Sequence, residues 1–235
     1  MDNLEKNLWK KTNRYCRLLR WVPFLRFVGV CNSLAFSRVN AGSDIDLFII
    51  AKTGRLFIVR SIVTLIFQVL GVRRHGDKVA GRFCLSFFVD DEHLDLSEIS
   101  IERDIYLAFW VRSMKPVLED GVYQDFVSAN SWIDSYFEDI ALIPEKNGSS
   151  FSKLKGFFEF VFFPYLANIV ESILARWQLK RARLRASSVI DCSGLIVRPG
   201  ILKFHNIDRR AEYRGRWEDK YGEGALLSPE RFLSL

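Results

Sequence analysis

The chain has 235 residues, of which 49% are hydrophobic and 26% charged, and its formal net charge is +6. This composition is typical of a globular protein and excludes disorder over most of the chain. The four cysteines lie far apart and form no CxxC pair, which argues against a zinc site and against a disulfide framework. A reducing cytosol fits best, so we expect a cytoplasmic protein, with peripheral membrane association as an open alternative.

The first hundred residues predict an alternation of helices and strands. Residues 4–22 can form a basic amphipathic helix, and residues 24–30 read as a short buried strand. A second strand is predicted at 44–51, a helix at 55–70 and a third strand at 82–89. This βαβαβ order with short connections favours a mixed or parallel central sheet.

After about residue 100 the pattern becomes mainly helical. The predicted elements are helices at 104–117, 123–140 and 153–185, a linker at 144–150, and a strand or short hairpin at 194–204. We therefore expect an α+β fold with an α/β-like core. Residues 1–100 would hold the N-terminal helix and the βαβαβ core, and residues 101–235 would be a helical extension with a basic C-terminal segment.

One apolar segment, at 156–170, raises the question of a membrane. It contains Glu159, Pro164 and Asn168, and it is shorter than the roughly 20 apolar residues that a spanning helix needs. We expect a buried helix. An interfacial helix, followed by the basic run ARWQLKRARLR, is the alternative.

The positive charge is concentrated near the C-terminus. The segment 176–216 holds eleven Lys or Arg residues and three acids, a net charge of +8, so the rest of the chain is slightly acidic. Such a segment can bind an anionic membrane, nucleic acid or phosphates. A solvated helix face is the simpler alternative, and the sequence leaves both open.

Two acidic residues, Asp44 and Asp46, stand two positions apart at the start of the second predicted strand. Because side chains alternate in a strand, both carboxylates project from the same face. They repel each other unless a cation lies between them, and Mg²⁺ takes hard oxygen ligands while keeping positions for phosphates. In isolation, this spacing would more simply be a solvated strand end.

The residues before this pair strengthen the case. Asn32-Ser33 lies directly after the first predicted strand, twelve residues before Asp44. Ser33 can cap a helix that starts there and can offer its hydroxyl to a phosphate, while the helix start adds free backbone N–H groups. Gly42-Ser43 gives a flexible lead into the second strand. Together these features predict a phosphate-binding turn facing a cation site.

The run at 30–52 is similar to the DNA polymerase β-type nucleotidyltransferase superfamily, in particular to its minimal nucleotidyltransferases. That superfamily has a strand, a Gly-Ser helix start, a gap, and then Asp-hydrophobic-Asp on the next strand. Here the match is Asn32-Ser33 followed by GSDIDL, and GSDIDLFII is its most specific part. The resemblance covers roughly residues 24–90 and implies a nucleotidyltransferase-type mixed sheet flanked by helices.

By this resemblance, Asp44 and Asp46 would be catalytic and would hold Mg²⁺ (or Mn²⁺) that bridges the phosphates of a nucleoside triphosphate. Ser33 would touch the β- and γ-phosphates, and Asn32, Gly42 and Ser43 would complete the nucleotide-binding set. An acceptor hydroxyl would attack the α-phosphate in line and release pyrophosphate. We expect ATP as the donor, and the acceptor could be a protein, a small molecule or an RNA end.

Two departures from the superfamily pattern bear on activity. Asn32 stands where glycine is usual, and asparagine tolerates unusual backbone angles better than most residues. Many active members place a third carboxylate on the third strand, whereas 82–89 contains no acid and has Ser86 at its centre. The acidic residues at 90–95 can reach in or form a solvated turn. A nucleotide-binding regulatory module that has lost turnover is therefore one alternative function. A transferase that associates with a membrane surface through residues 153–185 and acts on a membrane-bound acceptor is the other.

Two further segments could complete the site. The loop 73–78 carries Arg74, which could hold a triphosphate or nucleic acid, or could serve only surface solubility. In the C-terminal part, His205 and Asp208 are close enough to meet on one helical turn, and Arg209 could bind phosphate. These residues would act only if the segment folds back over the aspartates; a polar helix start is the alternative.

Overall fold

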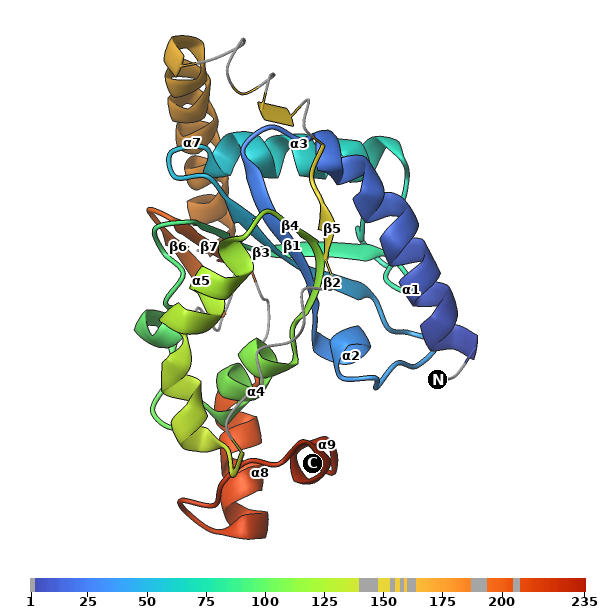
Figure 1. Ribbon diagram of the computed structural model, residues 1–235, viewed down its shortest axis with the longest axis vertical. Helices are drawn as coiled ribbons and strands as arrows, with labels where there is room; N and C mark the ends of the chain where they lie inside the picture. Colours follow the sequence, from blue (N-terminus) through green and yellow to red (C-terminus); the bar gives the residue numbers. More distant parts are fainter. Residues whose placement is uncertain are drawn as a thin grey trace.

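A seven-stranded mixed sheet forms the centre of the molecule, in the order β5-β4-β1-β2-β3-β7-β6. The computed structural model describes residues 3–139, 148–152, 155–156, 159, 164–186, 194–204 and 208–235. Helices pack on both faces of the sheet (Figure 1). The predicted mixed sheet flanked by helices is therefore confirmed.

The three central strands are β1 (Leu25–Cys31), β2 (Ile45–Ala51) and β3 (Phe83–Asp90). β1 and β2 pair antiparallel, whereas β2 and β3 pair parallel, with α3 (Leu56–Val69) between them in the chain. All residues of β2 are buried, because both faces of the sheet are covered. Each of these four elements begins and ends within one residue of its predicted bounds.

The outer strands extend the sheet at both edges. At one edge, β4 (Lys115–Glu119) pairs antiparallel with β1, and β5 (Ser149–Ser150) pairs parallel with β4. At the other edge, β7 (Ile201–Phe204) pairs antiparallel with β3, and β6 (Leu195–Arg198) pairs with β7. The hairpin predicted at 194–204 is thus confirmed. Strands from both sides of residue 100 share one sheet, and a domain boundary there stays a prediction.

Side chains alternate along the central strands and so divide the core into two layers. Val28, Leu47 and Ile49 face the first layer, whereas Phe27, Phe48 and Ile50 face the second. The first layer contains α1 (Asn3–Cys16), the 3₁₀ helix η1 (Arg17–Trp21), α3 and α7 (Pro164–Ala186). The second contains η2 (Leu96–Ile99), α4 (Ile105–Ser113), α5 (Val122–Ala129), η3 (Ser131–Tyr136), α8 (Arg210–Tyr221) and α9 (Pro229–Leu233).

Several helix predictions were wrong in extent. The helix predicted at 104–117 ends at Ser113, and β4 follows, because Pro116 disfavours a helical conformation of Lys115. The helix predicted at 123–140 divides at Asn130, whose side chain donates hydrogen bonds to the Leu94 and Phe126 carbonyls and so competes with the helix. Its predicted last residue lies outside the described residues.

The other differences lie at the N-terminus and in two later segments. The helix predicted at 4–22 becomes α1 followed by a 3₁₀ turn, in which Leu19 is buried against the core. The linker predicted at 144–150 lies partly outside the described residues, and its last two residues form β5.

The apolar segment 156–170 is not simply a buried helix. In its described part, Leu166 is 54% exposed and Ile169 is 47% exposed, whereas Ala167 is buried in the core. That part of the prediction was wrong, because α7 lies on the surface and packs against α3 along one side only. Within the described residues, none of the helices combines the length and the apolar character required to cross a bilayer.

Candidate functional site

The carboxylates of Asp44 and Asp46 and the thiol of Cys84 converge at the start of β2. One ligand atom from each of the three lies within 4.8 Å of the other two. Asp44 directly precedes β2, Asp46 is its second residue, and Cys84 lies opposite Asp46 in the parallel pairing with β3. The strand thus presents both carboxylates to one place, where they can share a cation.

Asp46 is buried in an environment that opposes its charge. Only 8% of the surface of Asp46 is exposed. Burial, and next the charge of Asp44, raise the pKa of Asp46 to about 6, although hydrogen bonds from the Asn32 side chain and the Cys84 thiol act in the other direction. A nearby positive charge would stabilise the ionised form of this carboxyl group. Ionisable groups with pKa values shifted in this way are common in functional sites.

Arg74 already supplies one positive charge. Its Nη1 atom donates a hydrogen bond to Oδ2 of Asp44 at 2.7 Å, and its backbone N–H bonds the Phe83 carbonyl at 2.9 Å. Burial alone would lower the pKa of Arg74, but the charge of Asp44 outweighs this effect, so the pKa is raised. The Arg74 side chain remains 44% exposed, so the guanidinium lies at the border between the two carboxylates and solvent.

The turn after β1 brings Asn32 to the carboxylates. Asn32 has a φ of 55°, in the left-handed region that asparagine adopts more readily than most residues. Its side chain bonds the Asp46 carboxylate, and its Oδ1 atom accepts a hydrogen bond from the Tyr106 hydroxyl at 3.2 Å. Asn32 therefore combines the backbone conformation of this turn with a side-chain contact to the buried carboxylate.

Ser33 lies in the short helix α2 (Asn32–Ala35) and does not cap it. The helix begins at Asn32, so its N-cap is Cys31, which makes no side-chain capping bond. The prediction that Ser33 caps the helix was wrong, because the helix starts two residues earlier than expected. Ser33 is half-buried in the first turn of α2, and its contact with a phosphate stays a prediction.

The Gly42-Ser43 turn uses much of its own hydrogen-bonding capacity. The Gly42 N–H bonds Oδ1 of Asn40 at 2.8 Å, and Oγ of Ser43 accepts from the Asn40 N–H at 2.9 Å. The Ser43 carbonyl accepts from the Gly81 N–H at 2.7 Å. The turn therefore links the residues that precede β2 to those that precede β3, and it fixes the position of Asp44. A nucleotide contact by Gly42 and Ser43 stays a prediction.

On the third strand, the group closest to the aspartates is a thiol. Burial, and next the charge of Asp46, raise the pKa of Cys84 to about 12, although a hydrogen bond from Ser86 lowers it. Ser86, which lies two residues further along β3, thus contacts Cys84. The sequence did not single out Cys84, because its position opposite Asp46 depends on the register of two strands that are far apart in the chain.

Three acids at the end of β3 and just after it, Asp90, Asp91 and Asp95, lie away from Asp44 and Asp46. Asp90 pairs with Ala51 at the far end of β2 and contacts Nδ1 of His93 at 2.6 Å. Asp91 accepts hydrogen bonds from Thr53, and Asp95 caps η2. Each of these three carboxylates is engaged locally, so the alternative in which this run reaches into the site does not hold for them.

The C-terminal segment approaches the site through aromatic contacts. Tyr213 of α8 packs on Tyr106 with ring centroids 4.9 Å apart, and Tyr106 bonds Asn32. Arg209 is exposed directly before α8, and Asp208 binds Arg210. His205 lies outside the described residues.

Asp208 is held in an ion pair of its own. Burial alone would raise the pKa of Asp208, but the hydrogen bonds from Arg210 outweigh this effect and lower the pKa to about 2. The shortest of these bonds joins Nη2 of Arg210 to Oδ2 of Asp208 at 2.6 Å. Asp208 therefore organises the start of α8, and an accessory role at the aspartates stays a prediction.

A scan against protein-family models gives no match, and a search of the curated proteins gives no significant match. The function is therefore inferred from the geometry and chemistry of the site.

The donor set suits a divalent cation that binds together with a triphosphate. Mg²⁺ in such complexes takes one or two protein carboxylates, with phosphate oxygens and water filling its other positions. Asp44 and Asp46 could provide these two hard ligands. The Cys84 thiol is a soft donor and suits Mg²⁺ poorly, so the two aspartates are the protein ligands that fit.

Proposed function

We propose that the protein is a Mg²⁺-dependent nucleotidyltransferase that moves a nucleoside monophosphate from a nucleoside triphosphate, ATP in the first instance, to a hydroxyl acceptor. The observation that supports this most directly is the convergence of Asp44 and Asp46 beside the Asn32 turn, with Asp46 buried and its pKa raised. The spacing of these residues along the chain is also that of the superfamily the sequence resembles.

In this proposal, Asp44 and Asp46 would hold the cation, which supplies charge neutralisation for the triphosphate. Asn32 orients the Asp46 carboxylate through its amide group, and the Tyr106 hydroxyl holds Asn32 in turn. Arg74 stabilises Asp44 before the nucleotide binds, and its exposed guanidinium can then bind a phosphate oxygen. The protein thus contributes mainly positioning and electrostatic stabilisation.

The reaction can be tested by comparing two labelled forms of the same nucleotide. The full-length protein is incubated with Mg²⁺ and ATP carrying ³²P at either the α- or the γ-phosphate, together with candidate protein, small-molecule and RNA acceptors. Transfer of a nucleoside monophosphate labels the acceptor from α-³²P-ATP only, with release of pyrophosphate. Labelling from γ-³²P-ATP would show phosphoryl transfer and contradict the proposal.

The two aspartates are tested by isosteric variants. We expect Asp44→Asn and Asp46→Asn each to lower the transfer rate by at least about a hundredfold, because each removes a charged ligand of the cation. Asp125→Asn, at an exposed position on α5, is the matched control and should keep the wild-type rate. Label transfer that persists in Asp46→Asn would exclude this mechanism.

A nucleotide-binding regulatory module is the second candidate. Two features of β3 favour a regulatory module. The residue of this strand nearest the two aspartates is Cys84, which carries a thiol, and the strand has no acid before Asp90. Calorimetric titration with Mg²⁺-ATP and with a non-hydrolysable analogue separates the two functions. Binding of both nucleotides without pyrophosphate release, with every acceptor tried, would favour the regulatory function.

A further inference from the structure

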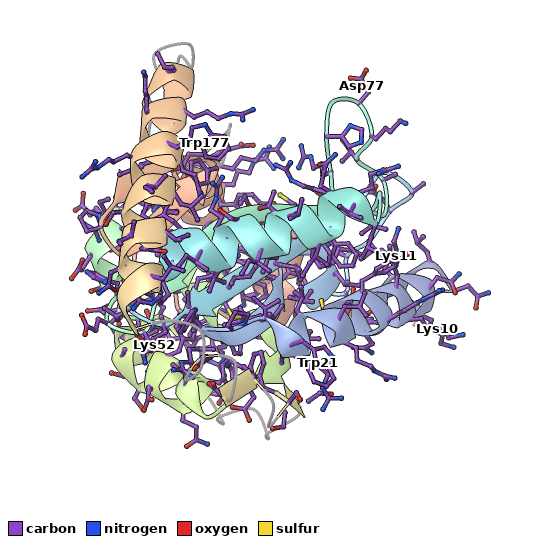
Figure 2. All side chains as sticks on the ribbon, turned by 90° about the horizontal axis from the view of Figure 1, so that it is seen from above. Lys10, Lys11, Trp21, Lys52, Asp77 and Trp177 are labelled. Atoms are coloured by element: carbon purple, nitrogen blue, oxygen red, sulfur yellow. The ribbon has the colours of Figure 1, made fainter. Side chains whose placement is uncertain are left out.

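The helices on one face of the sheet carry most of the exposed apolar side chains. We call α1, η1, α3 and α7 the basic layer. Eleven large apolar residues are exposed among the described residues, and all except Leu226 lie on this layer or at the end of α3. They are Leu18, Trp21, Leu65, Val69, Leu70, Leu166, Ile169, Ile173, Trp177 and Leu184. Figure 2 looks onto this layer and labels Trp21 and Trp177 on η1 and α7.

On α7, the exposed apolar residues form a single stripe. They recur at 166, 169, 173, 177 and 184, which is the spacing of one helix face. The opposite side of α7 packs on α3, where Glu171 and Gln178 bond its backbone. The stripe is therefore the outward side of a helix that the rest of the fold already holds in place.

The same layer has a strong net positive charge. Its helices contain twelve Lys or Arg residues and two acids, a net charge of +10, so the remainder of the chain carries −4. Both acids already have partners: Glu5 accepts a hydrogen bond from Ser37, and Glu171 accepts from two backbone N–H groups of α3. On α1, Lys6, Lys10 and Arg14 are exposed on the outward side.

We propose that the basic layer docks on the surface of an anionic lipid bilayer. Apolar and tryptophan side chains enter the membrane interface, while Lys and Arg bind the lipid phosphates. The apolar burial and the electrostatic attraction both contribute to the binding free energy. Nucleic acid would use the cations and the tryptophans but not eight exposed aliphatic side chains. A second copy of the same layer would be repelled by its like charge.

This docking mode would leave the candidate site free. Asp46 lies on the face of β2 that also carries Phe48 and Ile50, and these pack into the second layer. The basic layer covers the opposite face of the sheet. The proposal is therefore independent of the proposed function, and either can fail without the other.

Vesicle flotation with the full-length protein tests the proposal. The vesicles are made of phosphatidylcholine, either alone or with 30% phosphatidylserine. We expect flotation with the anionic vesicles, little with the neutral ones, and loss of binding at high salt. Failure to float with anionic vesicles, or equal flotation with both kinds, would overturn the proposal.

Two sets of surface variants locate the contact. The variant Ile169→Ser, Ile173→Ser, Trp177→Ser removes the stripe, and Lys6→Glu, Lys10→Glu, Arg14→Glu reverses charge on α1. Each should weaken vesicle binding at least about tenfold, because each removes one of the two attractive terms.

Leu226→Ser, at the exposed apolar residue outside the layer, is the matched control and should bind as wild type. Circular dichroism and thermal unfolding of each variant establish that the fold is kept. If both triple variants fold and bind like wild type, the surface is wrongly assigned. If light scattering finds a wild-type dimer that the stripe variant separates, the layer joins two copies and the proposal fails.

Discussion

Asn32 shows how one residue can meet two demands at the candidate site. Its backbone adopts φ 55°, which a glycine would adopt more easily, but glycine has no side chain that could also donate to Asp46 and accept from Tyr106. Asparagine is therefore compatible with the turn at this position, where the superfamily that the sequence resembles has glycine. It also adds a direct link between the turn and the buried carboxylate.

The raised pKa of Asp46 predicts that the site costs stability. We expect Asp46→Asn to increase the free energy of unfolding at pH 8 by about 1–3 kcal/mol in EDTA, because the amide is isosteric and carries no charge to bury. The folded pKa of about 6 lies above the unfolded value. The carboxyl group therefore costs nothing below about pH 4; its cost grows as the pH rises from about 4 to about 6 and is complete above that.

Urea unfolding of the variant and wild type between pH 4 and pH 8 measures this difference. The stabilising effect of Asp46→Asn should grow as the pH rises, whereas the exposed control Asp125→Asn should show no such trend. A gain that grows as the pH falls would contradict the assigned direction of the pKa shift. Stabilisation combined with loss of transfer activity is the pattern expected of a functional residue.

The sequence predicted part of this site for a definite physical reason. Asp44 and Asp46 are two positions apart, so strand alternation alone brings their side chains together. Cys84 and Tyr106 could not be found in that way. Their proximity to Asp46 and Asn32 depends on the β2–β3 register and on the packing of α4, which are contacts between distant parts of the chain.

At the scale of elements, α3 is capped by a residue from another helix. Its own N-cap residue, Arg55, makes no side-chain capping bond. Instead, the two carboxylate oxygens of Glu171 accept hydrogen bonds from the Phe57 and Ile58 N–H groups, each at 2.9 Å. The cap therefore joins α7 to α3 and supports the basic layer.

Removal of this cap should destabilise the protein. We expect Glu171→Ala to lower the free energy of unfolding by about 1–2 kcal/mol, because two N–H groups and the positive end of the helix dipole lose their partner. Glu171→Gln should cost less, since it keeps an acceptor. Asn168→Ala, at an exposed position on the same helix, is the control. Equal stability of Glu171→Ala and Asn168→Ala in urea unfolding would show that the cap contributes nothing.

The accuracy of the element predictions follows from burial. β1, β2 and β3 are predominantly apolar runs, so their bounds were visible in the sequence. β4 was missed because it directly follows the apolar helix α4, and only Pro116 marks the change. β5 has two exposed serines and no apolar pattern, so it forms through its pairing with β4 alone.

At the scale of the whole molecule, a buried ionic group ties the C-terminal helices to the rest of the fold. Arg210 is 5% exposed and pairs with both Asp104 and Asp208. Its Nη1 atom also donates to the Ile99 carbonyl at 2.6 Å. Asp104 caps α4 through the Leu107 N–H. One guanidinium thus connects η2, α4 and α8, and with them the aromatic contacts that reach Asn32.

Loss of Arg210 should therefore affect the whole molecule. We expect Arg210→Met to lower the free energy of unfolding at pH 7 by about 3–5 kcal/mol, because two buried carboxylates lose their partner. In wild type, Asp208 has a pKa of about 2, so its stabilising contribution is complete above the unfolded pKa and fades only as the pH falls towards 2. In the variant, burial acts on the Asp208 carboxyl group without the hydrogen bonds from Arg210 and favours its protonation, so the deficit should shrink as the pH falls from 7 to 4.

Urea unfolding at the two pH values measures this change, with Arg216→Met as the control. Arg216 lies on the same helix in an exposed pair with Glu212 at 2.6 Å, and its loss should cost under about 0.5 kcal/mol at either pH. If Arg210→Met and Arg216→Met cost the same, the buried group does not tie α8 to the fold. A deficit at pH 4 as large as at pH 7 would instead show that lost packing, and not unpaired charge, accounts for the effect.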